Sequence, residues 1–408
     1  MKGRWEVKKL GEACEFQRGL TYAKVDEVEV SANIVLRATN INLATNRLDF
    51  SELKYINENV IVPISKKVKK HSLMICTASG SKSHLGKVAY IDGDYDYAFG
   101  GFMGMITPKA NLVSKYLFHL MTSDAYKDFI SELSDGSNIN NLKFDDLRNF
   151  EIPVPPLPEQ QRIVALLDEA FAAIATAKAN AENNLKNARA LFDSYLNSVF
   201  SQRGDGWVEK PLAELCDIKH GFPFKSEFFA SQGDYVVLTP GNFYESGGYR
   251  DRAEKQKFYS GEIPNGYVMD AGQLLVVMTE QAAGLLGSPI LVPESDKFLH
   301  NQRLGLVNKK IGVPWTNEFF YHMFNTKYVR KEIHTSASGV KVRHTSPTKI
   351  GQVVVSFPAS IAEQQSIVAK LDALRAETQQ LESIYQKKIT ALDELKKSML
   401  HQAFTGEL

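Results

Sequence analysis

Two stretches of the sequence carry apolar residues at alternating four- and three-residue steps, one in the middle of the chain and one at its end. The step averages close to 3.5 residues, which is the spacing of a coiled-coil seam rather than of a broad core-facing stripe. Each stretch predicts a long helix of roughly 40 residues, about 60 Å at 1.5 Å per residue. The positions predicted to pair the two helices are Ile163, Leu167, Ile174, Phe192, Tyr195, Val199, Ile367, Leu371, Leu374, Leu381, Leu392 and Met399.

The two predicted helices begin with nearly the same sequence. Pro155–Asp168 contains Glu-Gln-Gln, and Phe357–Asp372 repeats this tripeptide 204 residues later. Proline stops the strand before the first helix, and Ser360 with Glu363 predicts a capping box for the second. Both helices are followed by a glycine, the residue that commonly ends a helix, at Gly204 and Gly406.

Exposing either apolar row to water is unfavourable, and the other predicted helix has a matching row that could cover it. We therefore expect the two helices to pair, antiparallel, because each follows a globular half and the halves would then lie at opposite ends of a rod. The alternative is that each helix packs on its own half as an ordinary core helix, and the length of the helices argues against it.

The globular halves also repeat each other. Cys14 matches Cys216, and the apolar run Leu73–Cys76 matches Leu274–Val277, with offsets between 201 and 204 throughout. A diverged duplication explains this pattern. The predicted boundaries are residues 1–154 and 205–356 for the two domains, and 155–204 and 357–408 for the two helices.

Within each half, short β-branched and aromatic runs alternate with glycine, as in Lys87–Ile91 and Pro289–Val292. A helical stretch follows, near Ser114–Leu133 in the first half and near Thr316–His334 in the second. Each half reads as a mixed domain with a curved sheet. The predicted fold class is α+β: two similar mixed α/β domains, joined by two long antiparallel coiled-coil helices, in an internal repeat with a pseudo-twofold.

The composition limits the classes of protein that the chain can belong to, but it does not indicate a function. The 408 residues have a formal net charge of +1, whereas a simple nucleic-acid binder usually has a marked basic excess. Charge is nevertheless uneven, with basic runs at Ser65–His71 and at Lys341–His344. We expect a cytoplasmic protein without a membrane segment, because no signal-peptide region and no 18-residue apolar run is present.

A search for catalytic motifs finds none that is convincing. Gly80–Lys87 has five residues between its glycines where a P-loop needs four, so we interpret it as a loop between strands. His119 and His322 are better explained as partly buried helix residues than as catalytic ones. The cysteines have no metal-site spacing and are expected to be buried thiols. The chain is therefore predicted to be non-catalytic, a binding part of something larger, with no metal and no cofactor of its own.

This arrangement resembles the specificity (S) subunit of type I restriction-modification systems, a host-defence family. The most specific pieces are Ile152–Gln161 and its echo Val355–Gln365; the opening Trp5-x-x-x-x-Leu10-x-Glu12-x-Cys14 also fits. The second helix departs from the family pattern, because its lead-in lacks the proline-rich form. There Ser360 can cap the helix instead.

The resemblance implies that each half is a target recognition domain that reads one part of a bipartite sequence in double-stranded DNA. It also implies that the paired helices set the spacer and dock methylation (M) subunits, two in number, while restriction (R) subunits complete the complex. S-adenosylmethionine, ATP and Mg are then expected on those partner subunits. A near-neutral chain is understandable if M subunits supply much of the phosphate contact.

Candidate base-reading residues are the loop positions whose donors and acceptors suit base edges. In the first half they are Arg18, Arg37, Thr39, Asn40, Ser81, Lys82, Ser83, Asn138, Asn140 and Lys143. In the second half they are Lys219, His220, Lys225, Asn242, Tyr244, Gln281, Asn301, Gln302, Arg303, Lys341, Arg343 and His344. Asn40 and Asn242 can equally be shared turn residues, since two domains that read different bases should differ where they read.

Other functions stay open from the sequence alone. One alternative is a coiled-coil scaffold whose two domains bind protein or sugar. Others are the specificity subunit of a two-subunit type II restriction enzyme, or a chain that is itself a nuclease or methyltransferase. The bases read, the spacer length and the presence of a nuclease partner do not follow from the sequence.

Overall fold

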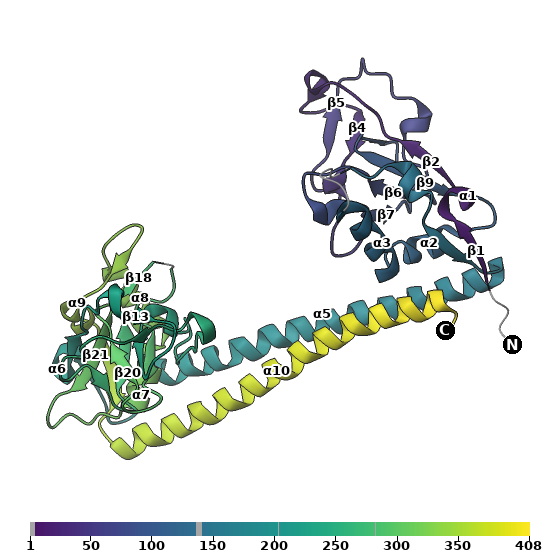
Figure 1. The fold of residues 1–408 in the computed structure, drawn as a ribbon. Helices are drawn as coiled ribbons and strands as arrows, with labels where there is room; N and C mark the ends of the chain where they lie inside the picture. Colours follow the sequence, from purple (N-terminus) through teal and green to yellow (C-terminus); the bar gives the residue numbers. More distant parts are fainter. Residues whose placement is uncertain (1–4, 136–140, 203, 282) are drawn as a thin grey trace. The chain divides into compact units, whose positions relative to one another are not determined.

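The computed structural model describes residues 5–135, 141–202, 204–281 and 283–408. The chain forms two compact units, one of Met1–Glu182 with Lys387–Leu408 and one of Asn183–Gln386. Each unit contains one α/β domain together with parts of both long helices, α5 (Leu157–Ser201) and α10 (Ile361–Thr405) (Figure 1). The predicted α+β class with two similar domains and two long helices is confirmed.

The first domain contains two four-stranded sheets and a two-stranded ribbon, rather than the single curved sheet that we expected. The sheet orders are β2-β9-β6-β7 and β3-β5-β4-β8, and the ribbon is β1-β10. All neighbours are antiparallel except β4 and β8. The strands are β1 (Glu6–Lys9), β2 (Cys14–Arg18), β3 (Glu27–Val28), β4 (Asn33–Leu36), β5 (Lys54–Ile56), β6 (Leu73–Cys76), β7 (Val88–Tyr90), β8 (Ala98–Phe99), β9 (Met103–Pro108) and β10 (Glu151–Val154).

The second domain repeats this plan. Its sheets have the orders β12-β21-β17-β19 and β13-β15-β14-β20-β16, with the ribbons β11-β23 and β18-β22. Its strands are β11 (Trp207–Pro211), β12 (Cys216–His220), β13 (Phe229–Ala230), β14 (Tyr235–Leu238), β15 (Phe258–Tyr259), β16 (Val268–Met269), β17 (Leu274–Val277), β18 (Thr279–Glu280), β19 (Pro289–Leu291), β20 (Phe298–His300), β21 (Leu304–Lys309), β22 (Arg343–His344) and β23 (Val354–Pro358).

The continuous apolar runs of β6 and β17 are explained by burial on both faces. Leu73 and Ile75 point into one core, and Met74 and Cys76 point into another. In the second domain Leu274 and Val276 point into one core, and Leu275 and Val277 point into the other. Because successive strand residues face opposite sides, a strand between two cores has no polar positions.

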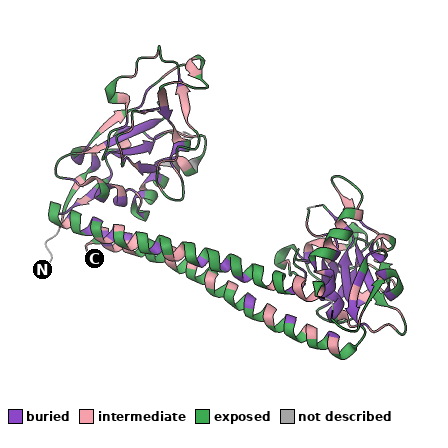
Figure 2. Cartoon of the chain, turned by 180° about the vertical axis from the view of Figure 1, so that it is seen from behind, coloured by how far each residue is buried: buried purple, intermediate pink, exposed green. Residues whose placement is uncertain are grey.

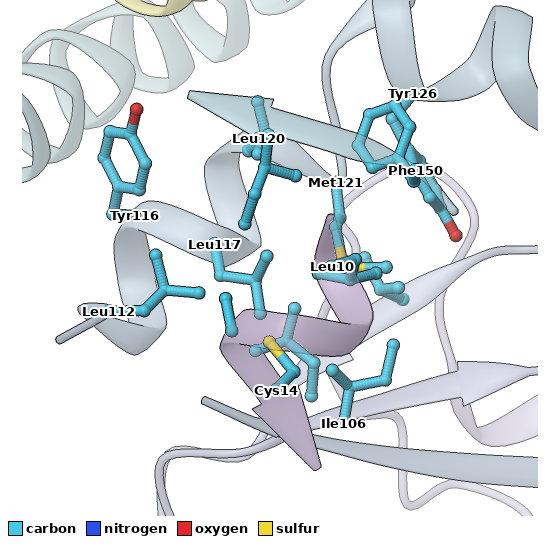
Figure 3. Packing of buried hydrophobic residues seen from close by; sticks show 14 of the residues in the cluster. Leu10, Cys14, Ile106, Leu112, Tyr116, Leu117, Leu120, Met121, Tyr126 and Phe150 are labelled. Carbon is cyan, nitrogen blue, oxygen red and sulfur yellow. The ribbon is translucent and has the colours of Figure 1, made fainter. Parts of the chain in front are cut away.

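Short helices cover one core of each domain. In the first they are α1 (Leu10–Ala13), α2 (Ser114–Leu120), α3 (Asp124–Asp135) and α4 (Phe144–Leu147); in the second they are α6 (Leu212–Leu215), α7 (Asn317–Phe324), α8 (Lys327–Ser336) and α9 (Pro347–Gly351). Figure 3 shows Leu117 and Leu120 of α2 packed toward Leu10 and Cys14.

Each helical stretch predicted as one helix is in fact two. The hydroxyl of Ser123 accepts a hydrogen bond from the backbone N–H of Tyr126 (3.4 Å), at the start of α3. In the second domain the hydroxyl of Thr326 accepts one from the N–H of Val329 (3.3 Å), at the start of α8. A capped N-terminus inside an apolar stretch begins a new helix.

The long helices are 45 residues each and pack antiparallel, as predicted. Within the first unit, Arg162 Nη2 donates to the carbonyl of Leu408 (2.9 Å), and Lys178 Nζ lies 2.7 Å from Asp393 Oδ1. The residue number rises along α5 as it falls on the α10 side, which defines the antiparallel direction there. Within the second unit, Arg189 Nε lies 2.9 Å from Glu382 Oε2. Figure 2 shows buried positions spaced along both helices.

The predicted pairing residues differ in burial. Ile163, Leu167, Ile174 and Leu371 are buried, whereas Tyr195 and Leu381 are each 38% exposed. Phe192, Val199, Ile367, Leu374, Leu392 and Met399 are half-buried. Further buried apolar residues of the two helices are Val164, Ala181, Leu185, Ala188, Leu196, Leu400 and Ala403.

The helix ends match the prediction in part. Gly406 follows α10 with a φ of +79°, as expected for a glycine that ends a helix. After α5 the positive φ falls on Gly206 rather than on Gly204. Ser360 caps α10 through the N–H of Glu363 (3.4 Å), but the Glu363 carboxylate accepts from the indole N–H of Trp207 (2.9 Å). Within the described part of the chain, no helix is both long and apolar enough to cross a membrane.

Candidate nucleic-acid interface

The repeated Glu-Gln-Gln attaches each long helix to its domain through the first glutamine. Gln160 is fully buried; its amide donates to the carbonyls of Asn111 (3.0 Å) and Pro155 (2.8 Å), and its oxygen accepts from the N–H of Val113 (2.7 Å). These bonds satisfy three backbone groups next to α2 and α5. We call Gln160 and its repeat Gln364 the glutamine clasps.

The second clasp has the same geometry. The amide of Gln364 donates to the carbonyls of Pro314 (2.8 Å) and Pro358 (3.0 Å), and its oxygen accepts from the N–H (3.0 Å) and the hydroxyl (3.1 Å) of Thr316. The neighbouring glutamines, Gln161 and Gln365, are exposed. The Glu-Gln-Gln tripeptide at the start of each long helix therefore holds the helix against its domain.

A histidine–aspartate pair lies beside each clasp. His119 Nε2 is 2.8 Å from Asp168 Oδ1, and His322 Nε2 is 2.8 Å from Asp372 Oδ1. Burial lowers the pKa of His119, so the neutral imidazole donates its Nε2–H to the carboxylate. Burial raises the pKa of Asp168, but hydrogen bonds from Lys115 and His119 outweigh this effect and hold it below its ordinary value. The histidines are structural, as the sequence indicated.

In the first domain, strand ends converge at one edge. Arg18 at the end of β2 pairs with Gly104, and Cys76 at the end of β6 pairs with Met103, so both strands end where β9 begins. The N–H of Gly100 donates to the carbonyl of Leu36 (2.9 Å), and this bond brings the end of β4 to the same edge. We call this place the first reading edge. It also includes residues 141–143, because Leu142 donates to the carbonyl of Thr77 (2.7 Å).

Several predicted contacts gather at this edge. Arg18, Thr39 and Lys143 are exposed, and Arg37 is half-buried. Ser81 and Ser83 are exposed on the loop between β6 and β7, with their hydroxyls 2.8 Å apart. The proposed contacts Asn138 and Asn140 lie outside the described residues, as does the side chain of Lys82.

The second domain forms an equivalent edge. His220 at the end of β12 pairs with Gly305, and Val277 at the end of β17 pairs with Leu304. The N–H of Thr345 donates to the carbonyl of Met278 (2.9 Å) and brings the end of the 341–344 segment to this second reading edge. Exposed predicted residues of the 216–344 region are Lys219, His220, Lys225, Tyr244, Gln281, Gln302, Arg303, Lys341 and His344.

Some of these side chains have local partners. Lys219 donates to the carbonyl of Gly266 (2.9 Å), and its ammonium lies 4.3 Å from the ring centroid of Tyr267. Lys225 lies 3.8 Å from Glu227, at the start of a short 3-10 helix. Cζ of Arg250 lies 5.9 Å from the ring centroid of Tyr244.

Three predicted contacts are internal instead. Asn40 and Asn242 are each 1% exposed and Asn301 is 5% exposed. The amide of Asn40 donates to the carbonyls of Asp49 and Glu52 (both 2.8 Å), and Asn242 closes the equivalent turn through the N–H of Thr239 (3.0 Å). Since their hydrogen-bonding groups are used inside the domain, we withdraw all three from the candidate DNA contacts.

A buried carboxylate at the second edge was missed by the sequence analysis. Glu280 is 1% exposed; one oxygen accepts from the N–H of Leu286 (2.8 Å), and the other lies 3.4 Å from Arg343 Nη1. Burial lowers the pKa of the nearby His334. The equivalent position in the first domain is Ser79, so no periodicity or repeat pointed to it. Arg343, a predicted DNA contact, is thus half-buried, with its guanidinium beside this carboxylate.

The three cysteines of the chain are buried inside the domains. Cys14, Cys76 and Cys216 are free and buried, and burial raises the pKa of Cys14 and Cys216 to about 12 and that of Cys76 to about 11. Among the residues that the structure describes, no group of three or more histidine, cysteine or acidic residues is placed to hold a metal ion.

The family model for the type I restriction modification DNA specificity domain matches this chain twice, over residues 2–187 and 204–391. The chain belongs to this family. It is a DNA specificity subunit of a type I restriction-modification system, and the scaffold and catalytic alternatives are set aside. S subunits of this family are non-catalytic, and the cofactors are carried by the M and R subunits.

Relatives span nearly the whole chain. The StySPI specificity subunit of Salmonella potsdam and the EcoKI specificity subunit of Escherichia coli K12 are each 26% identical to it, covering 99% of this chain and 89% of their own length. The HsdS subunit of Thermoanaerobacter tengcongensis has a TM-score of 0.64 at 18% identity, covering 100% of this S subunit and 98% of its own chain. A chain from a study of type I R-M complex assembly and conformational transition has a TM-score of 0.78, also at 18% identity, covering 100% and 99%. These structures share the fold.

Proposed function

We propose that each α/β domain reads one part of a bipartite DNA target with its reading edge. The paired helices set the spacing between the two parts and dock two M subunits. The observation that carries this proposal is that each domain has both a glutamine clasp and a reading edge. A clasped domain presents its edge in a fixed orientation to its helix, which is what spacing-dependent reading requires.

Double-stranded DNA suits the chemistry of the edges. They display arginine, lysine, histidine, glutamine and hydroxyl side chains, which can pair with base edges and phosphates. Loops held at strand ends are positioned by a rigid sheet, so their side chains can be selective. Near-zero net charge on the whole chain is compatible with DNA binding when partner subunits add phosphate contacts.

A repeated groove supports docking of two identical partners. In the first unit a groove of about 600 Å³ lies between the first domain and the end of α10, with Ser398 and Phe404 in its lining. In the second unit a groove of about 690 Å³ has their repeats, Ser194 and Phe200. Beside them Leu395 is 48% exposed and its repeat Leu191 is 50% exposed. Two equal sites suit two M subunits, and complete complexes would add R subunits.

Domain exchange tests modular reading. Residues 5–150 would be replaced by the same region of a relative with a different target, and the S subunit would be co-expressed with its M subunits. Genome-wide mapping of methylated adenines should show one altered half-site and one unchanged half-site. Changes in both half-sites would contradict the proposal.

A paired insertion tests the spacer role. Four residues, about one helical turn, would be added to each long helix, after Glu182 and after Gln386, where the two units meet in sequence. The helices lengthen by about 6 Å, near two base pairs of DNA. The same methylation mapping should then find the same two half-sites with a longer spacer; an unchanged spacer would contradict this role.

A further inference from the structure

One turn has the same backbone in both domains but opposite side-chain chemistry. In the first domain the N–H of Gly19 donates to the carbonyl of Met103 (3.1 Å), and Met103 donates to Gly100 (2.8 Å). In the second domain the N–H of Gly221 donates to Leu304 (3.3 Å), and Leu304 donates to Asn301 (2.9 Å). These equivalent bonds align residues 100–103 with residues 301–304. Phe102 therefore corresponds to Arg303.

The carbonyl groups of these two residues are anchored in the same way. The carbonyl of Phe102 accepts from the N–H of Thr77 (2.9 Å), and the carbonyl of Arg303 accepts from the N–H of Met278 (2.9 Å). Phe102 is held further by the N–H of Ala78 (3.1 Å) and the hydroxyl of Thr77 (2.9 Å). A backbone tied to the end of β6 or β17 gives each side chain a defined direction.

The turn lies at the centre of the reading edge. A Cβ atom on Gly19 would come within 1.9 Å of the carbonyl oxygen of Gly100, so the residue after Arg18 is in direct backbone contact with the turn. On the other side, a Cβ atom on Gly100 would lie 4.0 Å from Cγ of Arg37. The turn that carries Phe102 therefore contacts the residue after Arg18 and approaches Arg37 through Gly100, and the Phe102 side chain is 74% exposed.

We propose that Phe102 and Arg303 occupy the same base-reading position in the two domains, where Phe102 contacts the methyl group of a thymine and Arg303 binds a guanine. This inference rests on the proposed function, because it assumes that each edge faces one half-site. Aromatic side chains make apolar contact with the thymine methyl in the major groove. Arginine donates two hydrogen bonds to O6 and N7 of guanine in the same groove.

The duplication explains why the two residues differ. The backbone hydrogen bonds of the turn are kept in both copies, although its residues differ: Gly100 and Gly101 correspond to Asn301 and Gln302. A residue that chooses a base is expected to change when the target changes. His300 differs from its equivalent Phe99 but has a structural role, because it is buried and donates from Nε2 to the carbonyl of Leu304 (3.0 Å). Burial lowers its pKa to about 4, so the imidazole stays neutral and continues to support the turn that presents Arg303.

Base-analogue scanning of duplex DNA tests the proposal with the S subunit in complex with its M subunits. In the first half-site, each thymine is replaced in turn by uracil, which lacks only the methyl group. One replacement should weaken binding of the unmodified protein by about fourfold, the value of one buried methyl-sized group. Phe102→Ala should bind thymine and uracil duplexes equally at that position.

The second half-site is scanned with 7-deazaguanine, which lacks the N7 acceptor. One replacement should weaken binding of the unmodified protein by roughly tenfold, and Arg303→Ala should be indifferent to it. Ile311→Ala provides a matched control, because Ile311 is fully exposed and follows the opposite end of β21. Both analogue responses should persist in that control.

The outcomes separate this inference from the proposed function. If Phe102→Ala and Arg303→Ala keep the analogue responses of the unmodified protein, the inference is wrong, although domain exchange can still move one half-site. If domain exchange fails to move a half-site, the proposed function itself fails. Phe102→Leu, which preserves an apolar side chain, gives a second reading if the alanine variant does not fold, since it should retain part of the uracil response.

Discussion

The two α/β domains agree where they meet the long helices and differ where they face outward. Each buries one glutamine of Glu-Gln-Gln and joins a helix histidine to an aspartate of the long helix. At the reading edges, by contrast, Phe102 corresponds to Arg303 and Ser79 corresponds to the buried Glu280. The attachment of a domain to its helix has been kept after duplication, and the edge that we propose to read DNA has changed.

This difference has a simple physical reason. A clasp side chain satisfies backbone donors and acceptors that have no access to water, so most replacements leave a buried group unpaired. An exposed side chain at a strand end has no such constraint, and its replacement costs little stability. Changes at the edges can therefore alter recognition without disturbing the fold.

The largest effect that we expect comes from the clasp. Gln160→Ala leaves the N–H of Val113 and the carbonyls of Asn111 and Pro155 without their partner, and should lower the free energy of unfolding by about 3 kcal/mol. Gln161→Ala, next to it and exposed, should change stability by less than about 0.5 kcal/mol. Urea denaturation of both variants measures the difference. Equal effects would show that the clasp is not the attachment.

Removal of the buried carboxylate tests a feature of the second domain, where the first domain has Ser79 at the equivalent position. Glu280→Ala leaves the N–H of Leu286 and the Arg343 guanidinium without this partner, with an expected loss of about 2 kcal/mol. The equivalent Ser79→Ala should be nearly silent in denaturation experiments. With the M subunits present, methylation mapping of the Glu280 variant should show relaxed reading of the second half-site alone; relaxed reading of both would contradict a local role.

The exposed repeat leucines provide a test in which the two domains should behave alike. Leu191→Ser or Leu395→Ser should leave stability nearly unchanged and reduce the number of bound M subunits from two to one, because each removes one apolar contact beside one groove. Mass measurement of the purified complex gives the stoichiometry. Ile384→Ser is the matched control, since Ile384 is 49% exposed on α10 and lines neither groove. Retention of two M subunits in both leucine variants would place the docking site elsewhere.

The smallest expected effect concerns pH. Burial holds the pKa of His119 below its ordinary value, so the unfolded chain takes up a proton there before the folded protein does. Stability should therefore fall as the pH decreases from about 7 through the ordinary histidine range toward the lowered pKa. His119→Gln should flatten this dependence by up to one proton in urea denaturation at several pH values. An unchanged slope would mean that His119 has the same pKa in the folded and the unfolded chain, contrary to this expectation.

The sequence determined the architecture of this S subunit to a large extent. A 3.5-residue apolar period predicts paired helices, because that spacing keeps one stripe facing a partner helix along its whole length. The repeat at offsets between 201 and 204 predicted two similar domains, and the motifs around Glu-Gln-Gln indicated the family. These features are patterns within the linear sequence, so a single chain was sufficient to find them.

Tertiary structure alone decided the sheets and the reading edges. The order of β2, β9, β6 and β7 depends on pairings between residues far apart in the chain, which no local pattern encodes. From the sequence, Asn40 and Asn242 were candidate base readers or equally shared turn residues, and the hydrogen bonds of their side-chain amides decide for the turn. Phe102 has no polar group and drew no notice in the sequence. Its turn lies at the same edge as Arg18 and Arg37 only because three strand ends, distant in sequence, are hydrogen-bonded there.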